Sequence, residues 1–114
     1  MKAVFIELPA FERYRDKYLD DDNFRRLQDA LTVNPVAGEM IEGSGGLRKL
    51  RFGDLRRAKG KRGGLRVIYY YWTRGPEFWL FTLYGKDETS DLTSKQRAEL
   101  NERVKSELKA RRES

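Results

Sequence analysis

Two β-prone segments joined by a short turn constrain the fold of this chain more than any other feature. Residues 65–72 read Leu-Arg-Val-Ile-Tyr-Tyr-Tyr-Trp, and residues 77–84 read Glu-Phe-Trp-Leu-Phe-Thr-Leu-Tyr. Both segments are rich in the β-branched and aromatic residues that strands favour. The four residues between them, Thr-Arg-Gly-Pro, form a turn sequence, so the two segments predict an antiparallel hairpin.

Two further strands are predicted outside the hairpin. Residues 3–8 form a short β-rich run, which we interpret as a strand buried on both faces. Residues 47–52 alternate so that Leu47, Lys49 and Arg51 share one side of the strand. Residues 36–46, with three glycines near their end, are interpreted as a connection without regular structure.

Three helices are predicted from apolar residues that recur every three or four positions. The stripes are Phe11, Tyr14 and Tyr18; Phe24, Leu27 and Leu31; and Leu100, Val104 and Leu108. Aspartates at 20–22 separate the first two helices and cap the second, while Thr93 and Gln96 form a capping box for the third. The last stripe is narrow, which indicates a helix that docks lightly or that a partner could cover.

The predicted order of elements is β-αα-β-β-β-α. It defines an α+β fold: an antiparallel meander sheet with an N-terminal αα-hairpin and a C-terminal helix, all helices packed on one face. A chain of 114 residues is expected to form a single domain, 1–114.

Composition excludes several kinds of chemistry. The chain has no cysteine and no histidine, so a thiol nucleophile, a disulfide, a thiolate metal site and a histidine acid–base pair are impossible. No metal site and no cofactor are expected. No run of apolar residues is long enough for a membrane span, and a carboxylate at Glu7 argues against a signal peptide, so we expect a cytoplasmic protein.

Positive charge is concentrated in one segment. Residues 48–66 contain nine Lys or Arg and one acid, a net charge of +8, whereas the whole chain carries +6. A concentrated cationic surface is typical of proteins that bind polyanions. The predicted RNA-binding residues in this segment are Arg48, Arg56, Arg57, Lys59, Lys61 and Arg62.

The ends of the meander strands are expected to converge into a shallow cationic floor on the exposed face of the sheet. Its predicted catalytic residues are Lys49, Arg51, Arg66, Tyr84 and Lys86. Arginine suits bidentate contact with phosphate and stabilisation of developing charge. A lysine with a depressed pKa could act as base, and a tyrosine or a second lysine could act as acid, so both assignments stay open.

Three segments together resemble the HigB branch of the RelE-type bacterial toxins. They are residues 45–51, Gly-Gly-Leu-Arg-Lys-Leu-Arg; residues 59–70, Lys-Gly-Lys-Arg-Gly-Gly-Leu-Arg-Val-Ile-Tyr-Tyr; and residues 83–88, Leu-Tyr-Gly-Lys-Asp-Glu. The resemblance extends over nearly the whole chain, and the middle segment is its most specific part.

The resemblance implies the toxin of a type II toxin–antitoxin pair. Such a toxin cuts mRNA in the A site of the 70S ribosome by metal-independent attack of the 2′-hydroxyl, and a small helix-turn-helix antitoxin silences it. The family pattern carries over to Lys49, Arg51, Arg66 and Lys86. The C-terminal catalytic tyrosine of the best-known branch has no counterpart, because no tyrosine follows Tyr84.

Two other functions remain open at the level of sequence. One is a non-catalytic basic module that binds RNA or the ribosome, and the other is a HigB-like domain that retains only antitoxin binding. Growth arrest that depends on Arg66 would separate the enzyme from both.

Overall fold

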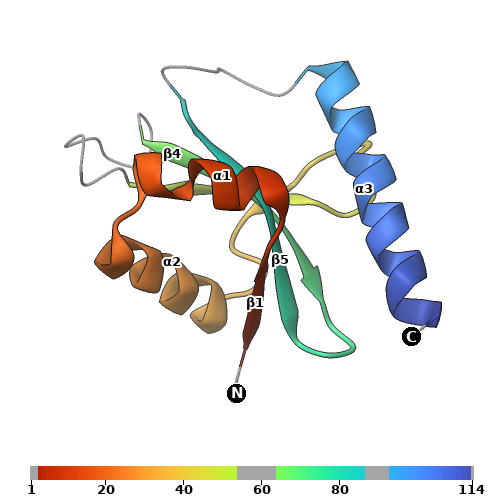
Figure 1. Cartoon of the computed structure of the whole chain (residues 1–114), viewed down its shortest axis with the longest axis horizontal. Helices are drawn as coiled ribbons and strands as arrows, with labels where there is room; N and C mark the ends of the chain where they lie inside the picture. The colour runs from red at the N-terminus through yellow and green to blue at the C-terminus, as the bar shows by residue number, and fades with distance from the viewer. Residues whose placement is uncertain (1–2, 54–63, 87–92, 114) are drawn as a thin grey trace.

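The computed structural model describes residues 3–53, 64–86 and 93–113. Within these residues the chain forms five strands and three helices (Figure 1). In chain order they are β1 (Val4–Glu7), α1 (Pro9–Tyr18), α2 (Asp21–Val33), β2 (Glu39–Met40), β3 (Arg48–Phe52), β4 (Leu65–Trp72), β5 (Glu77–Gly85) and α3 (Ser94–Glu113).

The strands form one sheet in the order β1-β5-β4-β3-β2. The predicted meander of β3, β4 and β5 is antiparallel throughout, and β1 joins it in parallel beside β5. The α+β prediction is therefore confirmed. The two-residue strand β2, which pairs Glu39 with Lys49 and Met40 with Arg48, was not predicted, because two residues are too few to show an alternation.

One face of the sheet packs against α1 and α2. Phe11 and Tyr18 from α1 and the leucines of α2 join the inward-facing residues of β4 and β5 in one buried cluster. Phe78 lies at its centre and stacks on the rings of Phe5 and Tyr71, each at a centroid distance of 4.8 Å. Burial of this apolar surface is the main driving force for folding of this layer.

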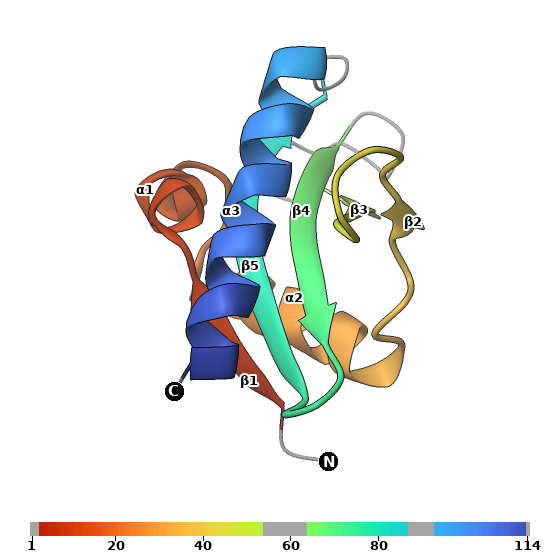
Figure 2. The same ribbon diagram turned by 90° about the vertical axis from the view of Figure 1, so that its right-hand side faces the viewer.

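The third helix covers the opposite face, so the prediction that all helices share one face is wrong. Figure 2 shows α3 in front of the strands and α2 behind them. Val104 is buried among Leu47, Ile68 and Trp79, with Leu100 and Leu108 packed around them. Alternation along β4 and β5 makes both faces apolar, and a second helix layer is needed to cover the second face.

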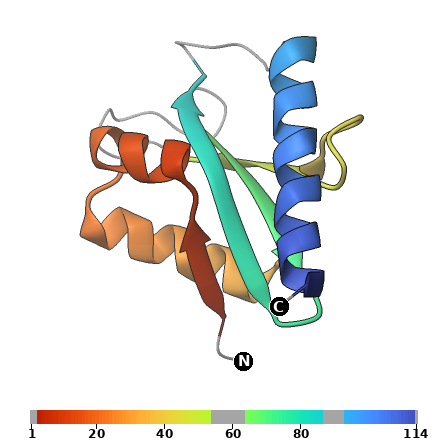
Figure 3. The ribbon, with the colours of Figure 1, turned by 45° about the vertical axis from the view of Figure 1, so that its right-hand side comes forward.

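The first strand lies at the edge of the sheet, and the prediction that it is buried on both faces is correct only in part, because Phe5 and Ile6 are partly buried against the two opposite clusters. Val4 is half exposed, and β1 pairs only with the first half of β5, from Glu77 to Leu80. Pro9 then turns the chain into α1, which continues beside the second half of β5 (Figure 3). The second half of β5 is therefore bordered on this side by α1 and not by a strand.

The predicted helix caps are confirmed. The Asp20 carboxylate accepts a hydrogen bond from the backbone N–H of Asn23 at 2.8 Å, at the start of α2. Thr93 and Gln96 exchange backbone-to-side-chain hydrogen bonds of 2.8 and 3.1 Å at the start of α3. In the described parts of the chain, no helix combines the length and apolar character that crossing a membrane requires.

Candidate functional site

A row of polar side chains crosses three neighbouring strands at one end of the sheet. Arg51 of β3 lies opposite Arg66 of β4, and Arg66 lies opposite Tyr84 of β5. Residues that face each other across a sheet project from the same side. Tyr84 packs against the cluster that α3 covers, so the whole row lies on the α3 face.

Lys49 belongs to the adjacent row on this face. It lies opposite Ile68, which in turn lies opposite Thr82. Adjacent rows on one face of a strand are about 7 Å apart, so Lys49 and Arg51 present two cations along β3. The prediction that Lys49 and Arg51 lie on the same side of their strand is confirmed.

The four side chains differ in exposure. Arg51 is exposed, Lys49 and Tyr84 are partly buried, and Arg66 is only 3% exposed. The prediction of a shallow, exposed cationic floor is therefore wrong for Arg66, because this residue is buried. It donates a hydrogen bond to the carbonyl oxygen of Leu65 at 3.2 Å, which helps to fix its orientation.

Burial makes Arg66 costly for the fold. Removing a guanidinium from water costs several kcal/mol unless hydrogen bonds and neighbouring groups compensate. A buried charge is screened less by water than an exposed charge, so it attracts nearby anions more strongly. Arg66 can thus add a fixed positive potential beside Arg51.

Lys86 is brought to the same end of the sheet. Its backbone N–H donates to the carbonyl of Gly64 at 3.0 Å, which extends the pairing of β4 and β5 beyond Leu65. The side chain of Lys86 is exposed. The structure thus places Lys86 one residue pair beyond the Leu65–Gly85 pair and close to the start of β4.

Arg48 does not join this group. It projects from the opposite face of β3, as the alternation predicts, and its Nη1 donates to the carbonyl of Gly38 at 2.8 Å. Its role in the structure is to hold the segment before β2. The other five predicted RNA-binding residues lie outside the described residues: Arg56, Arg57, Lys59, Lys61 and Arg62.

Beside Arg48, Tyr69 is fully buried and fastens the same segment. Its hydroxyl donates to the carbonyl of Pro35 at 2.8 Å and accepts from the N–H of Gly38 at 3.0 Å. Burial raises the pKa of Tyr69, while the Gly38 hydrogen bond and the charge of Arg48 partly oppose that rise. Tyr69 is therefore a structural phenol and not a proton donor for the row.

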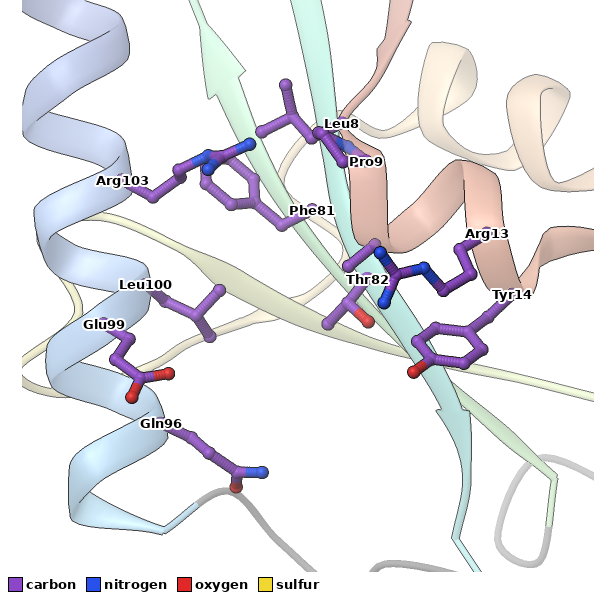
Figure 4. A pocket seen from close by; sticks show the side chains of 11 residues that line it. Leu8, Pro9, Arg13, Tyr14, Phe81, Thr82, Gln96, Glu99, Leu100 and Arg103 are labelled. Carbon is purple, nitrogen blue, oxygen red and sulfur yellow. The ribbon is translucent and has the colours of Figure 1, made fainter.

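A groove of about 550 Å³ lies beside the row, between α1 and α3 (Figure 4). Its floor is Phe81 and Thr82, and its walls carry Arg13 and Tyr14 from α1 and Arg103 from α3. A β-bulge builds this floor, because the register shifts between Ile68 and Tyr69 and leaves Phe81 without an opposite residue.

The sequence does not predict this groove, because Tyr14 falls at a position of the apolar stripe of α1. Phe11 and Tyr18 are buried, whereas Tyr14 is 42% exposed. Tyr14 lies on the margin of the stripe, between Arg13 and Arg15, and this polar flanking is the signal that could have separated it from the core.

No group of three or more acidic side chains that could hold a metal ion occurs in the described segments. On the edge strand β1, the carboxylate of Glu7 forms an ion pair with Arg15 at 3.1 Å. Partial burial raises the pKa of Glu7, and the charge of Arg15 acts in the opposite direction.

Comparison with known proteins identifies the fold. No protein-family model matches the chain. Among solved structures, the chain is similar to the Escherichia coli toxin RelE in its free state, determined for a mutant with two arginines replaced by alanine. The TM-score is 0.50 and the identity is 14%, over 79% of this chain and 90% of the other. The chain therefore has a RelE-like fold.

Proposed function

We propose that the chain is the toxin of a type II toxin–antitoxin pair, an endoribonuclease that cuts mRNA in the ribosomal A site. The observation that carries this proposal is the Arg51–Arg66–Tyr84 row on a RelE-like fold. The HigB-like motif in residues 59–70 supports the same assignment and favours the HigB branch.

The proposed reaction needs only the groups that this row and the neighbouring Lys49 and Lys86 supply. The 2′-oxygen of a ribose attacks the neighbouring phosphorus, a base takes its proton, and the bond from phosphorus to the 5′-oxygen breaks. An acid protonates the leaving 5′-oxygen, and a 2′,3′-cyclic phosphate remains. Lys49 and Lys86 are candidates for proton transfer, with Tyr84 as a third, and the acid and base are not assigned among them.

The arginines have separate roles in this proposal. Arg51 is exposed and contacts the scissile phosphate, where two N–H groups of one guanidinium can bind two oxygens. Arg66 lies buried beside Arg51 and stabilises the negative charge that develops on the phosphate oxygens.

The proposed partners follow from this activity. They are the 70S ribosome, mRNA and a cognate antitoxin, for which a small helix-turn-helix protein is the expected type. An activity on translating ribosomes would place the protein in the cytoplasm.

The test compares Arg51→Ala with Arg26→Ala, a matched exposed arginine on α2 that is far in sequence from the row. After induction, primer extension on cellular mRNA should show A-site cleavage by the parent and by Arg26→Ala. Arg51→Ala should cut on the order of a hundredfold more slowly, since one charge-stabilising contact is lost. Equal cleavage by both variants would remove Arg51 from the site.

Arg66 needs two variants because it is buried. Arg66→Met keeps most of the volume without the charge, and Arg66→Lys keeps the charge without the planar fork. With folding confirmed by circular dichroism, both should be less toxic, Arg66→Met the more so. A folded Arg66→Met variant that arrests growth fully would show that Arg66 serves packing alone.

A non-catalytic RNA-binding or ribosome-binding module is the second candidate. It is favoured by the burial of Arg66 and by the lack of a tyrosine after Tyr84. Growth arrest without new mRNA 5′-ends would support it. If the chain causes neither growth arrest nor cleavage, the remaining function is a domain that only binds an antitoxin. A 5′-phosphate product in place of the cyclic phosphate would contradict the proposed chemistry.

A further inference from the structure

The groove between α1 and α3 joins the Arg51–Arg66–Tyr84 row along β5. Thr82 in its floor and Tyr84 in the row project from the same face, one side-chain row apart, about 7 Å along the strand. An extended polynucleotide spans such a distance with about one nucleotide. An RNA strand bound at the row would therefore reach the groove with its next nucleotide.

The walls of the groove offer the two kinds of contact that an unpaired nucleotide makes. Tyr14 is 42% exposed as a residue and is not part of either core cluster, so its aromatic side chain is accessible. Figure 4 shows Tyr14 and Arg13 side by side on α1, with Arg103 and Glu99 on the α3 side. An exposed ring next to a guanidinium is a stacking platform with a phosphate contact beside it.

The charges in the groove favour an anionic occupant. Arg13 and Arg103 line it together with one carboxylate, Glu99. Among the residues that the structure describes, neither guanidinium has an ion-pair partner. Within the described segments both guanidinium groups can therefore approach a phosphate, and the floor formed by Phe81 and Thr82 suits the face of a base.

We propose that this groove is a subsite for one nucleotide of a single-stranded RNA that crosses the row. The base stacks on Tyr14, and the guanidinium of Arg13 contacts the adjoining phosphate. This inference rests on the proposed function, because it takes the row as the place where the RNA is cut. It adds a binding residue, Tyr14, that acts through its ring and not through its hydroxyl.

The test measures binding of a fluorescein-labelled hexaribonucleotide to the full chain by fluorescence anisotropy. Tyr14→Ala should weaken binding about tenfold, whereas Tyr14→Phe should stay within about twofold of the parent, since stacking needs only the ring. Arg13→Ala should weaken binding and reduce the slope of log K against log salt by about one. Arg26→Ala is the matched control and should change neither quantity appreciably.

A second measurement locates the base directly. The same hexanucleotide carrying one 5-bromouridine is irradiated with the protein, and the crosslinked peptide is found by mass spectrometry. A crosslink within α1 at Tyr14 supports the proposal. Crosslinks confined to β3 and β4 would overturn it.

The outcomes separate this inference from the proposed function. If mRNA is cut in an Arg51-dependent way but Tyr14→Ala and Arg13→Ala bind the oligonucleotide like the parent, only the groove proposal fails. If Tyr14 governs binding but no mRNA is cut, only the proposed function fails. The groove proposal is also overturned if the parent chain binds no oligonucleotide. It is overturned as well if Tyr14→Ala and Arg13→Ala lose binding of a fluorescein-labelled hexaglutamate peptide but keep binding of the RNA.

Discussion

The two faces of the sheet are covered in different ways. On the α1/α2 face, two helices close a continuous apolar cluster around Phe78. On the α3 face, a single helix with a narrow stripe covers a smaller cluster around Trp79 and leaves a groove and a cationic row at its margin. The two faces therefore contribute differently: the α1/α2 face supplies most of the stability, and the α3 face combines a smaller apolar cluster with exposed polar side chains.

The largest expected effect tests the first half of this comparison. Phe78 is fully buried and stacks on two aromatic rings, so Phe78→Ala removes contacts that no neighbour can replace. We expect a loss of about 3–5 kcal/mol in the free energy of unfolding. Urea denaturation followed by circular dichroism measures it, and a loss below about 1 kcal/mol would contradict the view that this face supplies most of the stability.

A smaller effect is expected on the α3 face. Val104 is also buried, but Val104→Ala removes only two methyl groups from a smaller cluster and should cost about 2 kcal/mol. Because Trp79 lies in the same cluster, its fluorescence should shift to longer wavelength as α3 loosens. A loss as large as that of Phe78→Ala would mean that the two faces are equally important for stability.

The third prediction concerns a polar contact within the α1/α2 side. Tyr69→Phe removes the hydroxyl that joins the carbonyl of Pro35 to the N–H of Gly38 and leaves both without that partner. The cost should be roughly 1–2 kcal/mol, with unchanged fold, and hydrogen exchange at Gly38 should accelerate. Unchanged exchange at Gly38 would show that the Arg48 contact alone holds this segment.

The smallest effect lies at the edge where α1 leaves the sheet. The pKa of Glu7 is raised above its ordinary value of 4.5, so the folded state binds this proton more tightly than the unfolded state. The resulting stabilisation is present below pH 4.5 and is lost as the pH rises through the raised pKa of the folded state. Glu7→Gln should flatten this dependence.

The magnitude for Glu7 should be below about 1 kcal/mol, because the pair with Arg15 is partly solvated. Denaturation of the parent and of Glu7→Gln at several pH values on both sides of the ordinary pKa measures it. A stability of the parent that rises through this window relative to Glu7→Gln would show that the ion pair with Arg15 outweighs burial.

Several features could be predicted because they depend on local sequence. The hairpin of β4 and β5, the helix caps at Asp20 and Thr93 and the shared face of Lys49 and Arg51 follow from turn residues, capping residues and alternation. The unpredicted strand β2 has no such signal, since its two residues are ordered by their partners on β3.

The candidate site was predictable only in part. The resemblance and the charge pattern predicted Arg51 and Arg66, the expected convergence of strand ends predicted Tyr84, and strand register places the three residues in one row. The sequence did not predict the burial of Arg66, because a cation at the start of a strand is usually solvated. The groove at Tyr14 depends on a bulge in β5, and a one-residue register shift leaves no clear mark in composition.

By itself, the sequence of this protein determined its elements other than β2, the order of those elements, its α+β class and the concentration of positive charge in one segment, because all of these depend on residue type and short-range periodicity. Only the tertiary structure decided that α3 covers the face opposite α1 and α2, that Arg66 is buried between Arg51 and Tyr84, and that a groove opens beside them. These features depend on which apolar face each helix covers and on the register between strands, and both are set by contacts between residues distant in the chain.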